Sequence, residues 1–368
     1  MSGPVTLPVD RLVDLWPNRL CGSDFRLGAL LHSASVTADL TPTLSVLESI
    51  AEDGGFFRLS ALFGPQHGFE STTQDNMVEW NGFRHPRLGI PVFSLYGEHR
   101  EPTPEMLSAV DGLFVDLVDA GARYYTFIWT MLLAMQACEK AGKPIIVADR
   151  PNPINGVTTE GWPQREDHLS FVGLHPLLQR HGKTIGELAE QFREERFPEL
   201  DLTILPMTGW DRSLFFAETG LSWVMPSPNM PTLDTAIVYP GVCLLEGTNL
   251  SEARGTTRPF ELFGAPWIAD GYGFCRKLNQ LGLPGVHFRE ASFEPMFQKH
   301  MGGFCRGAQI HVTNRDTFLP VKTGVEILKL VGSEYPEDFA WNPPPYEYET
   351  RKLPIEILLG VPVGDIFP

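Results

Sequence analysis

Residues 112–152 read GLFVDLVDAGARYYTFIWTMLLAMQACEKAGKPIIVADRPN, and this stretch decides the fold class. The apolar run at 112–116 predicts a buried strand, the apolar spacing over 127–141 predicts a helix, and the run at 144–148 predicts a second strand. A strand, a helix and a strand in this order form a βαβ unit with two parallel strands. The sequence therefore predicts an α/β fold.

The same alternation continues on both sides of this unit. Further strands are expected at 26–32, 58–63, 92–95 and 202–206, and further helices at 41–52, 104–110 and 184–197. Thr184 and Glu187 have the spacing of a capping box at the start of the last of these helices. The pattern is typical of a Rossmann-like domain with a mostly parallel sheet.

The amino-acid composition changes after residue 208. Long segments rich in Pro, Gly and Trp follow, and ordered loops of that length are uncommon unless they are functional. The chain has 368 residues, which is enough for two cores. We therefore expect a Rossmann-like catalytic domain at 1–208 and a smaller α/β domain at 209–368, with long loops that close a cleft.

Charge and cysteine content narrow the class of partner. A net charge of -16 disfavours nucleic acid and anionic membranes, so a small carbohydrate substrate is the better partner. The five cysteines are widely spaced and form no CxxC pair, which predicts neither a disulfide framework nor a zinc site. The N-terminus lacks a basic segment followed by an apolar one. A cytoplasmic location is expected, or a periplasmic or secreted one if a signal was removed.

Polar side chains follow four of the expected strands. The carboxyl ends of parallel strands are where open α/β sheets bind ligands, so these residues are expected to form a site. They are His67, Glu98, Asp116, Asp119, Arg123, Asp149, Arg150 and Asn152. Any one of them alone is equally typical of a turn or a satisfied ion pair.

The chain contains no GxGxxG, GxxxxGK[ST], GxSxG or HExxH motif. This disfavours a nucleotide cofactor, a serine esterase and a zinc protease, and leaves chemistry based on carboxylates, histidine and tyrosine. No cofactor or metal is expected. Hydrolysis of a glycosidic bond requires a protonated carboxyl and usually a second group at the oxocarbenium centre. By position the candidate carboxyl groups are those of Glu98, Asp116 and Asp119.

Several long motifs occur in one order across most of the chain: FGPQHG, PVFSLYG, DLVDAGARYYTF, DRPNPINGVTTEG, RHGKTIGELA, PSPNMPT, YPGVCLLEGTNLSEARGTTRPFELFGAPW and EYPEDFAW. In this order and spacing they resemble the exo-β-N-acetylmuramidases, which remove N-acetylmuramic acid from the non-reducing end of peptidoglycan fragments. The resemblance implies a bacterial glycosidase that serves cell-wall recycling. It also implies a Rossmann-like domain and a smaller α/β domain with the sugar in the cleft between them.

The resemblance further implies a catalytic glutamate in a Glu-His-Gly triplet after the second strand, and an Arg-aromatic-Tyr-Thr segment in the same pocket. These positions are Gln66-His67-Gly68 and 123–126 in this chain. Gln66 is a departure, because an amide cannot protonate a leaving group as a carboxylic acid can. Val118 and Ala253 stand where the family tends to have Gln and Gly, and these departures are expected to be minor.

One hypothesis is that Glu98 supplies the missing carboxyl, so that Glu98→Gln would abolish turnover and leave the fold intact. The lactyl carboxylate of muramic acid calls for an arginine fork, which Arg123, Arg150 or Arg254 could supply. Arg254 is equally expected to pair with Glu252 or Glu261 and order its own loop.

Sugar hydroxyls or the N-acetyl group are expected to contact some of Asn229, Glu246, Thr248 and Asn249, which could also serve as loop scaffolding. One aromatic ring among Tyr124, Tyr125, Trp210 and Trp223 is expected to stack on the sugar. The candidate catalytic residues are Gln66, His67, Glu98, Asp116, Asp119 and Tyr125. The candidate substrate-binding residues are Arg123, Tyr124, Thr126, Arg150, Asn152, His181, Asn229, Glu246, Asn249 and Arg254.

Two alternatives remain open. Because of Gln66, the chain could bind its sugar without turnover or act on a related substrate. It could also be a metal-dependent hydrolase that uses His67, Asp75, Asp116 and Asp119, in which case chelators would inhibit it.

Overall fold

A computed structural model describes residues 4–53 and 55–367, which fold as two compact units. Unit 1 comprises residues 1–119, 125–157 and 182–228, and unit 2 comprises 120–124, 158–181 and 229–368. The chain therefore passes between the units several times. The expected domain division at 208/209 stays a prediction.

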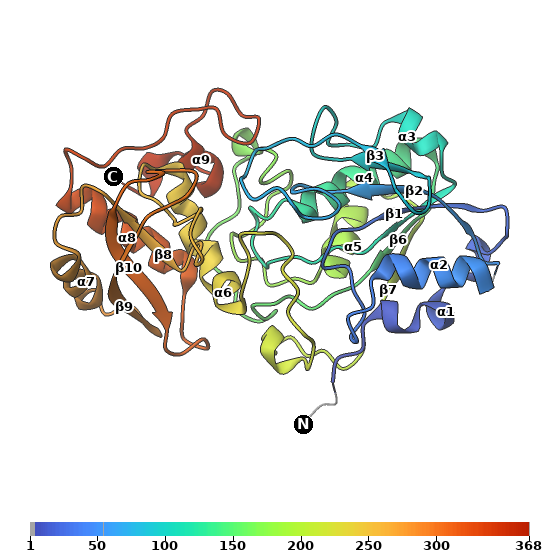
Figure 1. Ribbon diagram of the computed structural model, residues 1–368, viewed down its shortest axis with the longest axis horizontal. Coiled ribbons are helices and arrows are strands. Elements are labelled where there is room, and N and C mark those ends of the chain that lie inside the picture. Colours follow the sequence, from blue (N-terminus) through green and yellow to red (C-terminus); the bar gives the residue numbers. More distant parts are fainter. Residues whose placement is uncertain (1–3, 54, 368) are drawn as a thin grey trace. The chain divides into compact units, whose positions relative to one another are not determined.

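Unit 1 contains a seven-stranded sheet in the order β3-β4-β2-β1-β5-β6-β7 (Figure 1). Its strands are β1 (Arg26–Leu30), β2 (Arg58–Gly64), β3 (Phe83–Arg84), β4 (Pro91–Ser94), β5 (Gly112–Val115), β6 (Ile145–Ala148) and β7 (Leu202–Leu205). All neighbours pair in parallel except β3 and β4. The mostly parallel α/β sheet is confirmed, and the six expected strands end within two residues of their expected bounds.

The helices of unit 1 are α1 (Leu12–Leu15), α2 (Thr43–Asp53), α3 (Pro104–Ser108), α4 (Phe127–Ala141) and α5 (Ile185–Arg196). α1 and α2 pack their apolar side chains with those of the sheet in one core. α4 is apolar almost all round and contacts α5 through Trp129 and Phe192, whose ring centroids lie 5.9 Å apart. The capping box of α5 is confirmed, since the Thr184 hydroxyl accepts from the Glu187 N–H.

The centre of the sheet is a topological switch point. The chain proceeds from β1 to β2 in one direction and from β5 to β6 and β7 in the other, so the crossovers diverge between β1 and β5. Open α/β sheets bind ligands at the carboxyl edge beside such a point. Gly28 lets β1 pack closely there, since an added Cβ would lie 2.9 Å from the Val110 side chain.

Unit 2 contains an antiparallel sheet in the order β8-β10-β9, built from β8 (Leu262–Ala265), β9 (Val286–Phe293) and β10 (Cys305–Val312). Its helices are α6 (Leu233–Val242), α7 (Gly271–Gln280), α8 (Pro320–Glu334) and α9 (Pro354–Leu359). Helix α6 is followed at once by a 3-10 helix at Cys243–Gly247. Among the helices of the described residues, none is long and apolar enough to cross a membrane.

Candidate active site

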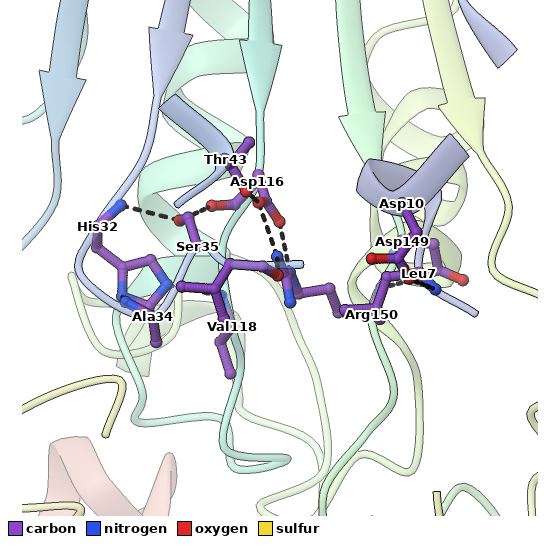
Figure 2. A network of polar contacts seen from close by, with 12 residues as sticks. Leu7, Asp10, His32, Ala34, Ser35, Thr43, Asp116, Val118, Asp149 and Arg150 are labelled. Atoms are coloured by element: carbon purple, nitrogen blue, oxygen red, sulfur yellow. Dashed lines mark hydrogen bonds and ion pairs between the residues drawn. The ribbon is translucent and has the colours of Figure 1, made fainter. Parts of the chain in front are cut away.

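A buried ion pair holds the strand ends of unit 1 together. Asp116, directly after β5, accepts from the Arg150 guanidinium, with Oδ2 2.8 Å from Nη2 and a second bond between Oδ1 and Nε. The Thr43 hydroxyl donates to the same Asp116 carboxylate at 2.6 Å. Figure 2 shows the Arg150 guanidinium beside Asp116, close to the residues that follow β1. This pairing accounts for the burial of Asp116 without a catalytic role.

His32 follows β1 and was not among the residues expected to form the site. Its Nε2 accepts from the backbone N–H of Val118 at 3.0 Å, which requires an unprotonated nitrogen. Burial lowers the pKa of His32 to about 3, against the opposing attraction of Asp116. The ring also lies edge-on to Phe127, with centroids 4.9 Å apart. His32 is therefore a neutral imidazole that fixes the loop after β5.

Gln66 and His67 lie in the tight turn after β2, and both are buried. His67 has a φ of +69°, a region that side-chain-bearing residues rarely adopt. Its Nδ1 lies 2.8 Å from the Thr73 carbonyl, which accepts only, so Nδ1 carries the proton. Backbone strain of this kind is common at functional sites, where the surrounding structure holds it in place.

The turn after β2 meets the segment that leads into α4. The Thr126 hydroxyl donates to Gln66 Oε1 at 2.6 Å. Tyr125 is buried beside it, with its ring centroid 4.8 Å from that of Phe127. Unit 1 thus brings together two of the expected site residues from separate loops, Gln66 and Thr126. Asp119, which ends the unit 1 part of the loop after β5, is 4% exposed.

Glu98 differs from these residues because its side chain is 88% exposed. Its nearest recorded partner is His99, with Nε2 3.8 Å from the carboxylate. A carboxyl that acts as a general acid near neutral pH is usually buried, and Glu98 is not. Its proposed role as the missing carboxyl stays a prediction that this exposure disfavours.

Asp149, after β6, has a perturbed carboxyl. Burial raises its pKa to about 6. Its Oδ1 accepts from the backbone N–H groups of Gly186 at 2.7 Å and Arg150 at 3.0 Å. An added Cβ at position 186 would lie 2.7 Å from the Asp149 carboxyl carbon, so the close approach requires glycine. Asp149 therefore anchors the first turn of α5. Asn152 is likewise occupied, since its Nδ2 donates to Lys183 O at 2.9 Å and its Oδ1 accepts from Ile154 N at 3.0 Å.

In unit 2, Arg123 is fully buried and satisfies backbone carbonyl groups. Its Nη1 donates to Trp162 O and Leu177 O, and its Nη2 donates to Leu358 O and Leu359 O, at 2.7–3.0 Å. Burial lowers the pKa of Arg123 to about 10. These four hydrogen bonds account for the burial of Arg123 through a structural role. Its expected contact with a substrate carboxylate stays a prediction.

Glu246 and Arg254 form the centre of a buried charge network in unit 2. Arg254 Nη2 lies 2.8 Å from Glu246 Oε1, and its Nε lies 3.6 Å from Glu252. Burial raises the pKa of Glu246, but Arg254 and a 2.8 Å hydrogen bond from the Tyr346 hydroxyl outweigh it, and the pKa is held below its usual range. Of the two partners expected for Arg254, the pair with Glu252 is confirmed, whereas Glu261 pairs with Arg258.

The remaining expected residues of unit 2 lie in its loops. The Tyr124 hydroxyl donates to Pro240 O at 3.1 Å, and the Asn249 amide bonds Asp338 O at 2.7 Å and Ala340 N at 3.0 Å. Thr248 donates to Leu245 O at 2.8 Å. His181 and Asn229 are both buried. Contact of these side chains with a sugar stays a prediction, as does the cleft between the domains.

Family models match nearly the whole of the chain. The model described as "Exo-beta-N-acetylmuramidase NamZ, N-terminal" matches residues 27–234, and its C-terminal counterpart matches residues 237–363. The chain belongs to this exo-β-N-acetylmuramidase family. The expected family resemblance is confirmed over both parts of the chain.

Relatives of known sequence and structure agree. The chain is 45% identical over 331 residues to the peptidoglycan beta-N-acetylmuramidase of Bacillus subtilis (strain 168), covering 90% of this chain and 78% of the relative. A crystal structure of a DUF1343 family protein from Bacteroides fragilis NCTC 9343 matches with a TM-score of 0.81 and 31% identity, covering 91% and 84% of the two chains. A second one from that organism has a TM-score of 0.71 at 23% identity, covers 98% of this chain and 89% of its own, and shows the fold alone.

The Ala253 departure has a structural consequence for an exo-β-N-acetylmuramidase with this sequence. Ala253 has a φ of +61°, in the left-handed region that glycine adopts without a steric penalty. It is fully buried in unit 2, in contact with Phe293 and Cys305. The departure expected to be minor therefore places a strained residue immediately before Arg254.

The metal-dependent alternative receives no geometric support. Within residues 4–53 and 55–367, no three His, Cys, Asp or Glu side chains are grouped so as to hold a metal ion. Asp116, one of its four expected ligands, is bound to Arg150 instead. Inhibition by a chelator remains the test of this alternative.

The neutral state of His32 predicts a pH-dependent stability. The unfolded chain binds a proton at this imidazole below a pKa of about 6.5, whereas the folded chain does so only near pH 3. The unfolded state therefore holds more protons in this window, and stability falls as the pH falls through it. Between pH 7.5 and 4.5 we expect His32 to account for a loss of about 3 kcal/mol.

Denaturant unfolding of the wild type and of His32→Gln at these two pH values measures this contribution. Gln can still accept from the Val118 N–H but does not titrate, so its stability should fall by about 3 kcal/mol less than that of the wild type. Equal losses in the two proteins would show that His32 is not held neutral.

Proposed function

We propose that this chain is an exo-acting glycosidase that releases N-acetylmuramic acid, or a close amino sugar, from the non-reducing end of peptidoglycan fragments. The observation that carries the proposal is the 45% identity to the Bacillus subtilis peptidoglycan beta-N-acetylmuramidase over 331 residues. That similarity covers 90% of this chain, so it includes residues of both units. The buried turn at Gln66, at the carboxyl edge of the sheet, is where the chemistry is proposed to occur.

Within unit 1, Asp119 is the best candidate for a catalytic carboxyl. Asp116 is neutralised by Arg150, and Glu98 is exposed to solvent, whereas Asp119 is buried after the central strand β5. The Gln66 amide can hold a sugar hydroxyl or a water by hydrogen bonding, but it has no acidic proton. We therefore assign proton transfer to Asp119 and a positioning role to Gln66.

A second candidate function is sugar binding without turnover. Gln66 favours it, because an amide stands at the position where the family resemblance implies a catalytic glutamate. Such a protein would hold the terminal sugar and release no product. Rates of hydrolysis separate the two functions.

Chromogenic glycosides provide the test. We expect the purified chain to release the chromophore from a β-linked N-acetylmuramic acid glycoside and to leave the N-acetylglucosamine glycoside intact. Release from neither substrate by folded protein, combined with measurable binding of N-acetylmuramic acid, would support the non-catalytic function. Release from the N-acetylglucosamine glycoside alone would contradict the proposed specificity.

The same assay decides the role of Glu98. Because the Glu98 side chain is largely in solvent, we expect Glu98→Gln to change kcat by no more than about two-fold, the scale of a surface substitution. Abolished turnover in a variant with an unchanged unfolding transition would instead identify Glu98 as the missing carboxyl.

A further inference from the structure

Unit 1 contains a pocket at its switch point that none of the assigned roles uses. The pocket is small, and ten of its thirteen lining residues are apolar. Most of them follow β1, β5 and β6, and the wall is completed by Leu7, Phe216 and the segment 221–224. Trp223 and Phe216 meet edge to face there, with ring centroids 5.2 Å apart. Figure 2 shows Ala34, Val118 and Arg150 of this lining near the buried ion pair.

Arg150 is the one charged residue in the lining, and it is 7% exposed. Its Nε and Nη2 are occupied by Asp116, and Nη2 also donates to Val36 O at 2.7 Å. Among the described residues, no hydrogen bond or ion pair reaches Nη1. A mostly apolar pocket therefore has one buried cation, Arg150, whose Nη1 has hydrogen-bond donors to spare.

The charges around Arg150 determine which kind of ligand oxygen its Nη1 can bind favourably. The positive charge of Arg150 is already neutralised by Asp116, and Asp149 is a further buried carboxyl nearby in the same network. A carboxylate ligand would add a buried negative charge without a new partner, which is costly. A neutral carbonyl oxygen gains the hydrogen bond without that cost.

A ligand group with a carbonyl oxygen and a small apolar end fits both properties of the pocket. We propose that this pocket binds the acetamido group of the amino sugar, with its carbonyl oxygen on Arg150 Nη1 and its methyl group against Trp223. This inference rests on the proposed function for its substrate class and adds the residues that select the N-acetylated sugar. It places the lactyl carboxylate elsewhere.

Saturation-transfer NMR with free N-acetylmuramic acid tests the proposal, because this sugar carries one acetamido methyl and one lactyl methyl. We expect the acetamido methyl to receive the stronger saturation, and the N-deacetylated sugar to bind about ten-fold more weakly or worse, the range for a lost apolar group with its hydrogen bond. Stronger saturation of the lactyl methyl, or equal affinity for both sugars, would overturn the proposal.

Trp223→Ala and Met225→Ala are matched variants for the same experiment. Trp223 lines the pocket and is half-buried, whereas Met225, two residues later, is 48% exposed and lies outside the lining. We expect Trp223→Ala to remove the preference for the acetamido methyl, and Met225→Ala to retain it. If both variants retain the preference for the acetamido methyl, Trp223 does not form the wall against which this methyl group packs.

The measurement requires binding alone, so it separates this inference from the proposed function. Hydrolysis without preferential saturation of the acetamido methyl rejects the pocket and retains the glycosidase. Preferential saturation without hydrolysis rejects the glycosidase and retains the pocket. If the protein shows neither binding nor hydrolysis, both proposals are wrong.

Discussion

In the Asp119→Asn background, where the assigned proton donor is removed, replacement of Gln66 by glutamate is expected to raise kcat/KM for a β-N-acetylmuramic acid glycoside by about 10²–10⁴-fold, the usual contribution of a positioned general acid. The new carboxyl would keep the 2.6 Å bond from the Thr126 hydroxyl, because Oε1 occupies the same place in both side chains. The site is 6% exposed, and burial raises the pKa of a carboxyl, which favours the protonated form that the leaving oxygen needs.

Gln66→Met is the matched control, since it has a similar length and no acidic proton. Steady-state kinetics of Asp119→Asn and of its two double variants should place only the glutamate variant above the Asp119→Asn parent. A glutamate variant that is no faster than the Asp119→Asn parent would show that a carboxyl at position 66 cannot supply the proton. The pH profile adds a second check, because a general acid at position 66 should add a falling limb at high pH.

Asp119→Asn is expected to lower kcat by about 10²–10⁴-fold, because it removes the carboxyl that we assign to proton transfer. Asparagine has nearly the same shape, so the buried position after β5 is retained. The unfolding transition should therefore move far less than the rate. Stopped or continuous release of the chromophore from the β-N-acetylmuramic acid glycoside measures the loss.

Glu70→Gln is a control for this substitution, because Glu70 is an exposed carboxylate four residues after Gln66. It should retain the wild-type rate. An Asp119→Asn variant that keeps more than about a tenth of the wild-type kcat would remove Asp119 from the proton-transfer step. Restored activity of Asp119→Asn in combination with Gln66→Glu would show that the two positions serve the same step.

Much of unit 1 follows from local sequence patterns. The β-α-β stretch at 112–152 predicts β5, α4 and β6 almost to the residue, because each element has its own apolar period and is bounded by polar residues or glycine. The two-residue strand β3 has no such pattern and was not expected. The six parallel strands also place the polar loops at one edge, as the sequence predicts.

Partners that are distant in the sequence could not be predicted. Arg123 bonds carbonyl groups of Leu358 and Leu359, more than 230 residues away, so its segment alone suggests a substrate ligand. His32 is a single histidine after an apolar strand, and its partner Val118 lies 86 residues further along the chain. No local pattern in the sequence indicates either of these long-range hydrogen-bond pairings.

The sequence does not predict that each unit is built from several separate segments, for a similar reason. The domain boundary expected at residue 208 rests on a change in amino-acid composition. The segments 120–124 and 158–181 belong to unit 2 because of their contacts with its later residues. One such contact is the ion pair between Arg165, in the second of these segments, and Asp365, at 2.6 Å. Composition cannot reveal which short segments of a domain pack with a distant part of the chain.

The most direct test of the account is mass spectrometry of a defined peptidoglycan oligosaccharide with N-acetylmuramic acid at its non-reducing end, followed over time with the wild-type chain. The account predicts that free N-acetylmuramic acid appears together with an oligosaccharide shorter by that one residue. Larger internal fragments, or an unchanged oligosaccharide in the presence of folded protein, would contradict an exo-acting glycosidase.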